Sequence, residues 1–214
     1  IESGQDLEMP LGWNVDKAHD LLLEGLIQES QLDTMVYHIL ETFYRFGFYG
    51  GSYQAKPEWK NRYAQHIETA YETAKQGLVL LKNKNQALPI KPSDSTKILV
   101  TGPWLNKNPY GSGAGFVKGF NTVYFKEALK EVLRGKVQYI RRATKRSIQS
   151  ADVVILTVGT REGEDWDRPF SLPNKQEEYI KKVCRLNPNT VVVVHTGSGI
   201  RMTDWANDAA AIIW

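Results

Sequence analysis

Residues 153–158 read Val153-Val154-Ile155-Leu156-Thr157-Val158, and the expected architecture follows from this run. It is a continuous stretch of mostly β-branched residues, and Val191 to Val194 forms a second run of the same kind. Strands without polar alternation are typical of parallel sheets that are covered on both faces. A helical pattern at residues 175–184 separates the two runs, as expected for strands that alternate with helices. These segments predict an α/β protein.

The same alternation continues on both sides of these runs. Before them we predict strands at 98–101 and 137–140 with a helix at 125–133 between them. After them we predict a short helix at Asp204 and a last strand at 210–214. Four or five such strands predict an open, mostly parallel sheet sandwiched by helices.

The first eighty or so residues have a helical pattern instead. Apolar residues recur at helical spacing from Asp16 to Ile27, from Leu32 to Phe43 and from Trp59 to Gln76. The segment 48–57 contains Gly50-Gly51 and a proline, which predicts a loop or linker between the second and third helices.

Composition describes an ordinary globular chain of 214 residues, with 42% hydrophobic residues, 24% charged residues and a net charge of +3. These values exclude a disordered, fibrous or disulfide-framework protein. The single cysteine, Cys184, leaves the compartment open. No apolar stretch approaches the roughly 18 residues that a membrane span needs. The basic residues are spread along the chain, so we expect neither a membrane nor a nucleic-acid partner.

The loop after Val158 gathers groups that could do chemistry. Ligands of parallel sheets bind beyond the carboxyl ends of the strands. Residues 159–169 bring four carboxylates, two guanidinium groups and an indole to that position. Crowded acids beside arginines have separated pKa values, which a general acid requires. The alternative is a solvated loop that an ion pair between Asp167 and Arg168 holds in place.

Other motifs have plainer interpretations. The glycine loop 110–115 fits neither a dinucleotide fingerprint nor a phosphate-binding loop, and a surface turn is the alternative. His195 follows a strand without a nucleophile motif, which favours a hydrogen-bonded structural histidine. The remaining histidines lack the spacing of a zinc site. A basic cluster could contact phosphate, although a charged helix face explains it equally well; its members are Arg141, Arg142, Lys145 and Arg146.

A series of short motifs, in one order and over nearly the whole chain, resembles the β-glucosidases of glycoside hydrolase family 3. The motifs include Gly4 to Pro10, Gly77 to Asn83 with Leu88-Pro89, Gly111-Ser112-Gly113, Ala151 to Val154, Gly163 to Arg168, Leu172-Pro173 with Gln176, and Thr196-Gly197-Ser198.

The resemblance implies a domain organisation. Residues 1–50 would form the C-terminal part of a barrel domain, 51–96 a linker and helix, and 97–214 an α/β sandwich domain truncated at its C-terminus. The chain begins at Ile1 and ends in an apparent strand, so we expect a piece of a longer protein. The nucleophilic aspartate of the family would lie upstream, in the missing N-terminal barrel. That barrel is therefore the expected partner, and the isolated chain would be inactive.

The resemblance also implies site residues. Residues 163–168 resemble the family's Gly-Glu-Gly-Tyr-Asp-Arg loop, which implies that Glu164 is the catalytic acid/base. Asp165 stands where the family usually has glycine, and Glu162 is the alternative acid/base. Ser112 would contact a sugar hydroxyl, or be a simple turn serine. Trp166 would stack on the sugar or the leaving group, or fill the domain interface.

The implied reaction is hydrolysis of terminal β-D-glucosidic bonds by retaining double displacement. Such a reaction needs one carboxylate as nucleophile and a second as acid and then base. The expected substrate is a β-glucoside or short oligosaccharide, with no metal or organic cofactor. A β-xylosidase and a non-catalytic sugar-binding or interdomain module are the alternatives. The resemblance favours a secreted or periplasmic location.

Overall fold

The computed structural model describes residues 3–8, 15–51, 56–108, 111–117, 119, 122–133, 135–164 and 167–214. The chain forms two compact units, Ile1–Glu68 and Thr69–Trp214, each of which is described by itself. Within the described ranges, no helix is both long enough and apolar enough to cross a membrane.

The first unit is helical, as its sequence pattern predicts. Its helices are η1 (Val15–Lys17), α1 (Ala18–Leu23), α2 (Glu29–Arg45), η2 (Tyr49–Gly51), η3 (Pro57–Arg62) and the beginning of α3 (Tyr63–Gly77). Gln31 Oε1 accepts a hydrogen bond from the backbone N–H of Gln28 at 2.8 Å, which caps the start of α2. Gly47 follows the end of α2 with a φ of +73°, a conformation that glycine adopts readily. Among the described residues of this unit, only Ile27 is a buried hydrophobic residue.

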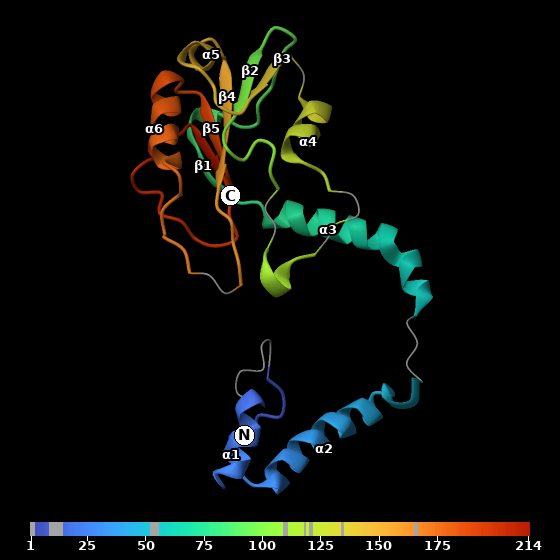
Figure 1. Ribbon diagram of the computed structural model, residues 1–214. Helices are drawn as coiled ribbons and strands as arrows, with labels where there is room; N and C mark the ends of the chain where they lie inside the picture. Colours follow the sequence, from blue (N-terminus) through green and yellow to red (C-terminus); the bar gives the residue numbers. More distant parts are fainter. Residues whose placement is uncertain are drawn as a thin grey trace. The chain divides into compact units, whose positions relative to one another are not determined.

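The second unit contains a six-stranded sheet in the described part of the chain, in the order β1-β6-β5-β4-β2-β3 (Figure 1). The strands are β1 (Leu80–Asn83), β2 (Lys97–Thr101), β3 (Lys136–Ile140), β4 (Val153–Gly159), β5 (Thr190–His195) and β6 (Ala211–Ile213). Strands β2 to β6 run parallel to one another, and the edge strand β1 is antiparallel to β6. The Val79–Trp214 backbone pair extends this edge, since the Trp214 N–H donates to the Val79 carbonyl at 2.8 Å.

Helices cover both faces of the sheet. Short η4 (Lys84–Gln86) and η5 (Gly113–Gly115) lie in connections, and the covering helices are α4 (Phe125–Val132), α5 (Lys145–Gln149) and α6 (Gln176–Leu186). One core joins Leu99, Val154 and Leu156 to Ile148 of α5 and Ile180 of α6. A second core lies on the opposite face, where Ile98, Val100, Leu105 and Ile155 pack against Phe125 and Leu129 of α4. Figure 1 shows α4 apart from α5 and α6, on the other side of the strands.

The predicted fold class is confirmed, with two differences in detail. The short helix predicted at Asp204 was wrong, because residues 203–208 form hydrogen-bonded turns. The short edge strand β1 was not expected, and it places 80–83 in the sheet, ahead of the predicted boundary at residue 97. The domain boundaries themselves stay a prediction.

The strand order creates a point at which the connections change direction. From β2 the chain passes to β3 at the sheet edge, then returns to β4 on the other side of β2. Ligands of open α/β sheets bind beyond the carboxyl ends of the strands at such a point. The loops after β2, β3 and β4 therefore form the expected binding edge of the sheet.

Candidate functional site

The loops that follow β4 and β5 leave the sheet side by side. Gly159 and His195 end these two strands and are partners in the register. A Cβ atom at Gly159 would overlap the carbonyl oxygen of His195 and would lie 2.8 Å from the ring of Trp104. A larger residue at position 159 would force the two loops apart.

Gln176, the first residue of α6, fixes the same strand end. Strand β2 ends at Thr101, opposite Leu156, so Gly159 has no strand neighbour on that side. The side-chain amide of Gln176 takes that place: its Oε1 accepts from the Gly159 N–H at 2.9 Å, and its Nε2 donates to the Gly159 carbonyl at 2.8 Å. Gln176 is buried, so both peptide groups of Gly159 are satisfied away from water.

Glu162 is the centre of a polar cluster that joins the two loops. Arg168 Nε donates to both of its carboxylate oxygens, at 3.0 and 2.9 Å. Further donors to the carboxylate are the hydroxyls of Thr160, Thr196 and Ser198 and the backbone N–H of Gly197. The side chains of Arg168 and Glu162 are 15% and 26% exposed, so this ion pair is largely shielded from solvent.

The surroundings of Glu162 keep it ionised. Partial burial alone would raise the pKa of its carboxyl, but the hydrogen bonds from Arg168, Thr160 and Thr196 and the Arg168 charge outweigh burial and lower the pKa to about 2. A carboxylate with so low a pKa holds no proton to donate near neutral pH. Among the described residues, the ion pair that holds this loop is Glu162–Arg168, whereas the sequence suggested Asp167–Arg168.

Arg168 extends this tether to the loop after β5. Its Nη2 donates to Ser198 Oγ at 2.6 Å, to the Ser198 carbonyl at 3.0 Å and to the Gly199 carbonyl at 3.2 Å. Sequence analysis assigned no role to Thr160, Thr196 and Ser198 in this cluster. Thr160 follows β4 directly and Thr196 follows β5 directly. Their proximity could be predicted only if β4 and β5 were known to be neighbouring strands.

Glu164 has a different environment from Glu162. It is exposed, and it lies beside the glycine turn that follows β2. A Cβ atom at Gly113 would be 3.2 Å from Glu164 Oε2 and 3.3 Å from Glu164 Cβ. Ser112 belongs to the same turn, and its hydroxyl donates to the Glu162 carbonyl oxygen at 3.1 Å. The structure thus brings Ser112 and Glu164 together, while Trp166 and Asp165 lie outside the described residues.

His195 is packed rather than presented to a substrate. Its ring stacks on Trp104 with 5.9 Å between centroids, and Phe125 contacts it edge-on at 5.3 Å. Burial lowers the pKa of His195 to about 4, so the ring is neutral at physiological pH. Its buried Nε2 has no hydrogen-bond partner among the described residues, whereas sequence analysis expected a hydrogen-bonded histidine.

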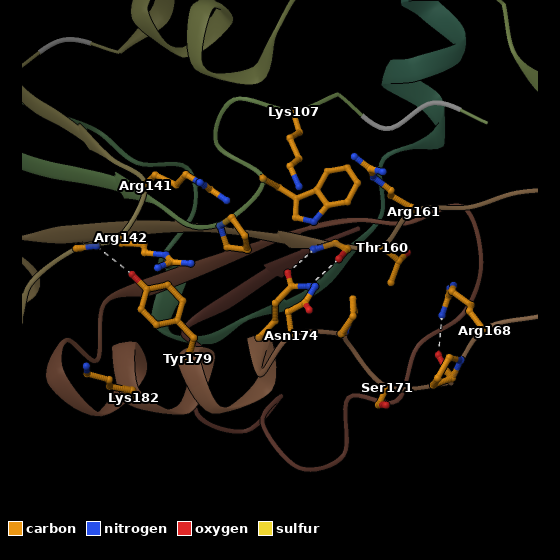
Figure 2. Close-up of a pocket in the computed structure, with 17 residues that line it drawn as sticks. Lys107, Arg141, Arg142, Thr160, Arg161, Arg168, Ser171, Asn174, Tyr179 and Lys182 are labelled. Carbon is orange, nitrogen blue, oxygen red and sulfur yellow. Dashed lines mark hydrogen bonds between the residues drawn. The ribbon is translucent and has the colours of Figure 1, made fainter. Parts of the chain in front are cut away.

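A cavity of about 880 Å³ lies next to these loops, above the change of direction between β2 and β4 (Figure 2). Its walls come from the loops after β2, β3 and β4 and from the beginning of α6. Neither Glu164 nor Ser112 lines it. Within the described ranges, no group of three or more His, Cys, Asp or Glu side chains is placed to hold a metal ion.

Comparison with known families matches residues 78–214 to the glycosyl hydrolase family 3 C-terminal domain. An exo-α-(1→6)-L-arabinopyranosidase of Bifidobacterium longum is 26% identical over 240 residues, covering 100% of this chain and 31% of the relative. β-D-Xylosidase 3 of Arabidopsis thaliana is 30% identical over 227 residues, covering 94% of this chain and 29% of the relative.

Solved structures agree with this match. The crystal structure of the Bifidobacterium adolescentis GH3 β-glucosidase superimposes with a TM-score of 0.65 at 26% identity, covering 100% of this chain and 33% of that protein. The chain therefore spans about a third of the length of the proteins that it matches.

Proposed function

Because the chain belongs to glycoside hydrolase family 3, we propose that it supplies the acid/base half of a retaining glycosidase acting on terminal β-D-glucosidic bonds. Glu164 is the proposed acid/base, and Ser112 and Trp166 are the proposed contacts to the substrate. The supporting observation is the position of Glu164, an exposed residue whose side chain lies beside the turn that contains Ser112. The nucleophile and most of the sugar site belong to a barrel domain outside these 214 residues.

The proposed chemistry has two steps. In the first, Glu164 donates its proton to the leaving oxygen while the nucleophile of the barrel attacks the anomeric carbon. In the second, the Glu164 carboxylate accepts a proton from the water that releases the sugar. The carboxyl group must reach both the leaving group and water, so an exposed loop position suits it.

The alternative acid/base, Glu162, fits this role poorly. Its two oxygens accept hydrogen bonds from Arg168, Thr160 and Thr196, and its pKa is lowered to about 2. Its contribution is to hold the loop, so that Glu164 stays beside the glycine turn. We therefore assign Glu162 and Arg168 as positioning residues.

Ser112 can serve the substrate and the scaffold together. Its hydroxyl proton is directed to the Glu162 carbonyl oxygen, at 3.1 Å. The lone pairs of the same oxygen can accept a hydrogen bond from a sugar hydroxyl. The Ser112 turn would thereby place the sugar relative to Glu164.

Substitution of Glu164 in the complete protein tests the proposal. Glu164→Gln is expected to lower the turnover of an aryl β-D-glucoside by about 10²- to 10⁴-fold, the typical contribution of a general acid/base. Azide should restore the rate for a substrate with a good leaving group, because the anion attacks the glycosyl intermediate without needing a base. Glu178→Gln, an exposed position on α6, is the matched control and should keep the wild-type rate.

The result also separates the alternatives. Wild-type rates in Glu164→Gln would rule out the assignment of the acid/base. Faster hydrolysis of a β-xyloside than of the β-glucoside would favour the second specificity, in line with the Arabidopsis xylosidase among the relatives. If the complete wild-type protein hydrolyses no glycoside but still binds sugar, the non-catalytic module is the better description.

A further inference from the structure

The charges around the cavity beside the sheet are of one sign. Its 17 lining residues include six lysines and arginines, and no aspartate or glutamate is among the described residues that line it. The six are Lys107, Arg141, Arg142, Arg161, Arg168 and Lys182. They come from four different parts of the fold: the loops after β2, β3 and β4, and helix α6. A single charged helix face therefore does not account for them.

Most of these cations have no carboxylate partner. Arg168 is committed to Glu162. Among the residues that the structure describes, none of the other five forms an ion pair. Lys107 lies over the ring of Trp104, at 5.4 Å from its centroid, which leaves its ammonium protons available. Several uncompensated cations around one concave site create a strongly positive potential.

Buried and partly buried hydrogen bonds hold the walls of this cavity. Gln176 bonds both backbone groups of Gly159, as described above. The Tyr179 hydroxyl lies 3.1 Å from Thr101 Oγ1 and accepts a bond from the Ala143 N–H at 3.3 Å. These contacts connect α6 to the ends of β2, β3 and β4. The backbone that carries the arginines is thus fixed before any ligand binds.

The arginines lie on two sides of the cavity. Figure 2 shows Arg141 and Arg142 on one side of the cavity and Arg161 on the other, next to the Arg168 that pairs with Glu162, with Asn174 and Tyr179 between the two sides. The carbonyl of Arg141 accepts from the Gly102 N–H at 3.2 Å, which fixes this turn to the loop after β2. The first turn of α6 borders the cavity through Gln176 and Tyr179, so the positive end of its dipole adds to the same field.

From this arrangement we propose that the cavity is a binding site for a phosphate-bearing ligand. Arginine presents a planar fork of donors that matches phosphate oxygens, and phosphate carries nearly two negative charges at neutral pH. The volume of about 880 Å³ exceeds what a lone phosphate fills and accommodates a phosphate ester with a sugar-sized body. A neutral glucoside gives no reason for five unpaired cations, so this site is separate in its chemistry from the proposed hydrolysis.

The basic cluster at 141–146 in the sequence consists of one pair of residues that lines the cavity and one pair that does not. Arg141 and Arg142 line the cavity, whereas Lys145 and Arg146 lie on the exposed surface of α5. These adjacent pairs carry the same charge, yet only one pair faces the proposed ligand. They provide a matched set of variants.

Binding to the complete protein tests the proposal. Isothermal titration in a phosphate-free buffer would use inorganic phosphate, glucose 6-phosphate and glucose, each up to about 10 mM. We expect both phosphates to bind, glucose not to bind at this site, and added salt to weaken the binding. The double variant Arg141→Gln/Arg142→Gln should weaken the binding about tenfold or more. The control Lys145→Gln/Arg146→Gln, with the same loss of charge, should bind as the wild type does.

A second variant tests whether the loss of binding comes from the lost charge or from local misfolding of the loop after β3. Lys182→Gln removes a cation from α6 instead of from the loop after β3, and it should weaken the same binding. Tighter binding of glucose 6-phosphate than of inorganic phosphate identifies an ester as the ligand, and equal affinities identify the free anion. No binding of either phosphate would overturn the proposal. Equal losses in the two double variants would also overturn it, because they would reveal a non-specific charge effect.

Discussion

Glu162 and Glu164 are only two positions apart, and their surroundings give them different chemistry. Glu162 accepts hydrogen bonds from two loops and pairs with Arg168, whereas Glu164 is exposed beside Gly113. Sequence patterns cannot separate two such neighbours, because the donors to Glu162 come partly from residues 196–198, beyond another strand. The resemblance named Glu164, and the structure adds the reason why Glu162 is unsuited to the same role.

The stability of the chain should depend on pH through Glu162. Folding lowers the pKa of the Glu162 carboxyl from 4.5 to about 2, so the folded state stabilises its ionised form. The resulting contribution, which solvent screening of this partly exposed pair limits to about 1–3 kcal/mol, is fully present above pH 4.5 and is lost as the pH falls toward 2. Urea unfolding followed between pH 7 and pH 2.5 should show this loss of unfolding free energy.

Two variants check the origin of this dependence. Glu162→Gln should lower the unfolding free energy at pH 7 and remove this part of the slope below pH 4.5. Glu178→Gln, on the exposed face of α6, should change the unfolding free energy by less than about 0.5 kcal/mol. An unchanged slope in Glu162→Gln would contradict the assignment.

Among the elements, α6 is joined to the end of β4 by the side chain of its first residue, Gln176, in addition to its apolar contacts with the sheet. Gln176 replaces the missing neighbour of Gly159, and its amide is buried. Gln176→Leu keeps a similar volume but leaves the N–H and C=O of Gly159 without partners. Each unsatisfied buried group costs about 1–3 kcal/mol. For these two groups we therefore expect a loss of about 2–6 kcal/mol in the free energy of unfolding.

Chemical denaturation measures this loss, and Gln149→Leu provides the control. Gln149 ends α5 in an exposed position, so its replacement should be nearly neutral. Gln176→Leu should also weaken phosphate binding in the neighbouring cavity, because Gln176 lines it. A Gln176→Leu protein as stable as the wild type would show that α6 is held by its apolar contacts alone.

The elements differ in how far their sequences predict them. The runs at 153–158 and 191–194 predicted β4 and β5, because a strand buried on both faces leaves a continuous apolar signal. Strand β1 was missed because Leu80–Asn83 is short, largely exposed and partly polar, as edge strands often are. The segment near Asp204 was predicted as a helix, but residues 203–208 form turns ahead of β6.

The two units of the chain are unequally packed. The described residues of the α/β unit contain two apolar cores, whereas those of the first unit bury one hydrophobic residue, Ile27. Helix α2 carries Val36, Leu40 and Phe43 at helical spacing, and they are 53%, 51% and 49% exposed. Such a stripe is the usual mark of a face that packs against other elements. The proposed barrel domain would supply these elements.

Hydrogen exchange on the 214-residue chain should show this difference. Helix α6 buries Gln176, Ile180, Val183 and Cys184, while α2 has no buried residue. We expect the amides of α6 to exchange at least about a hundredfold more slowly than those of α2, because packing raises the free energy of local opening. Mass spectrometry of peptic peptides from the two helices measures the ratio. Equal protection would contradict the unequal packing.

The pairing of β1 with β6 affects how the protein can be made. A ribosome releases residues 80–83 long before residues 211–213, so β1 waits for its partner while the intervening strands are translated. During that interval the backbone N–H and C=O groups of Leu80–Asn83 lack the strand that they pair with in the folded sheet, and unpaired strand edges favour aggregation of a nascent chain. In a circular permutant that begins after β1 and carries β1 behind β6, the two strands would be synthesised one after the other. The yield of soluble protein from its translation, compared with that of the natural order, would measure the effect of the delay.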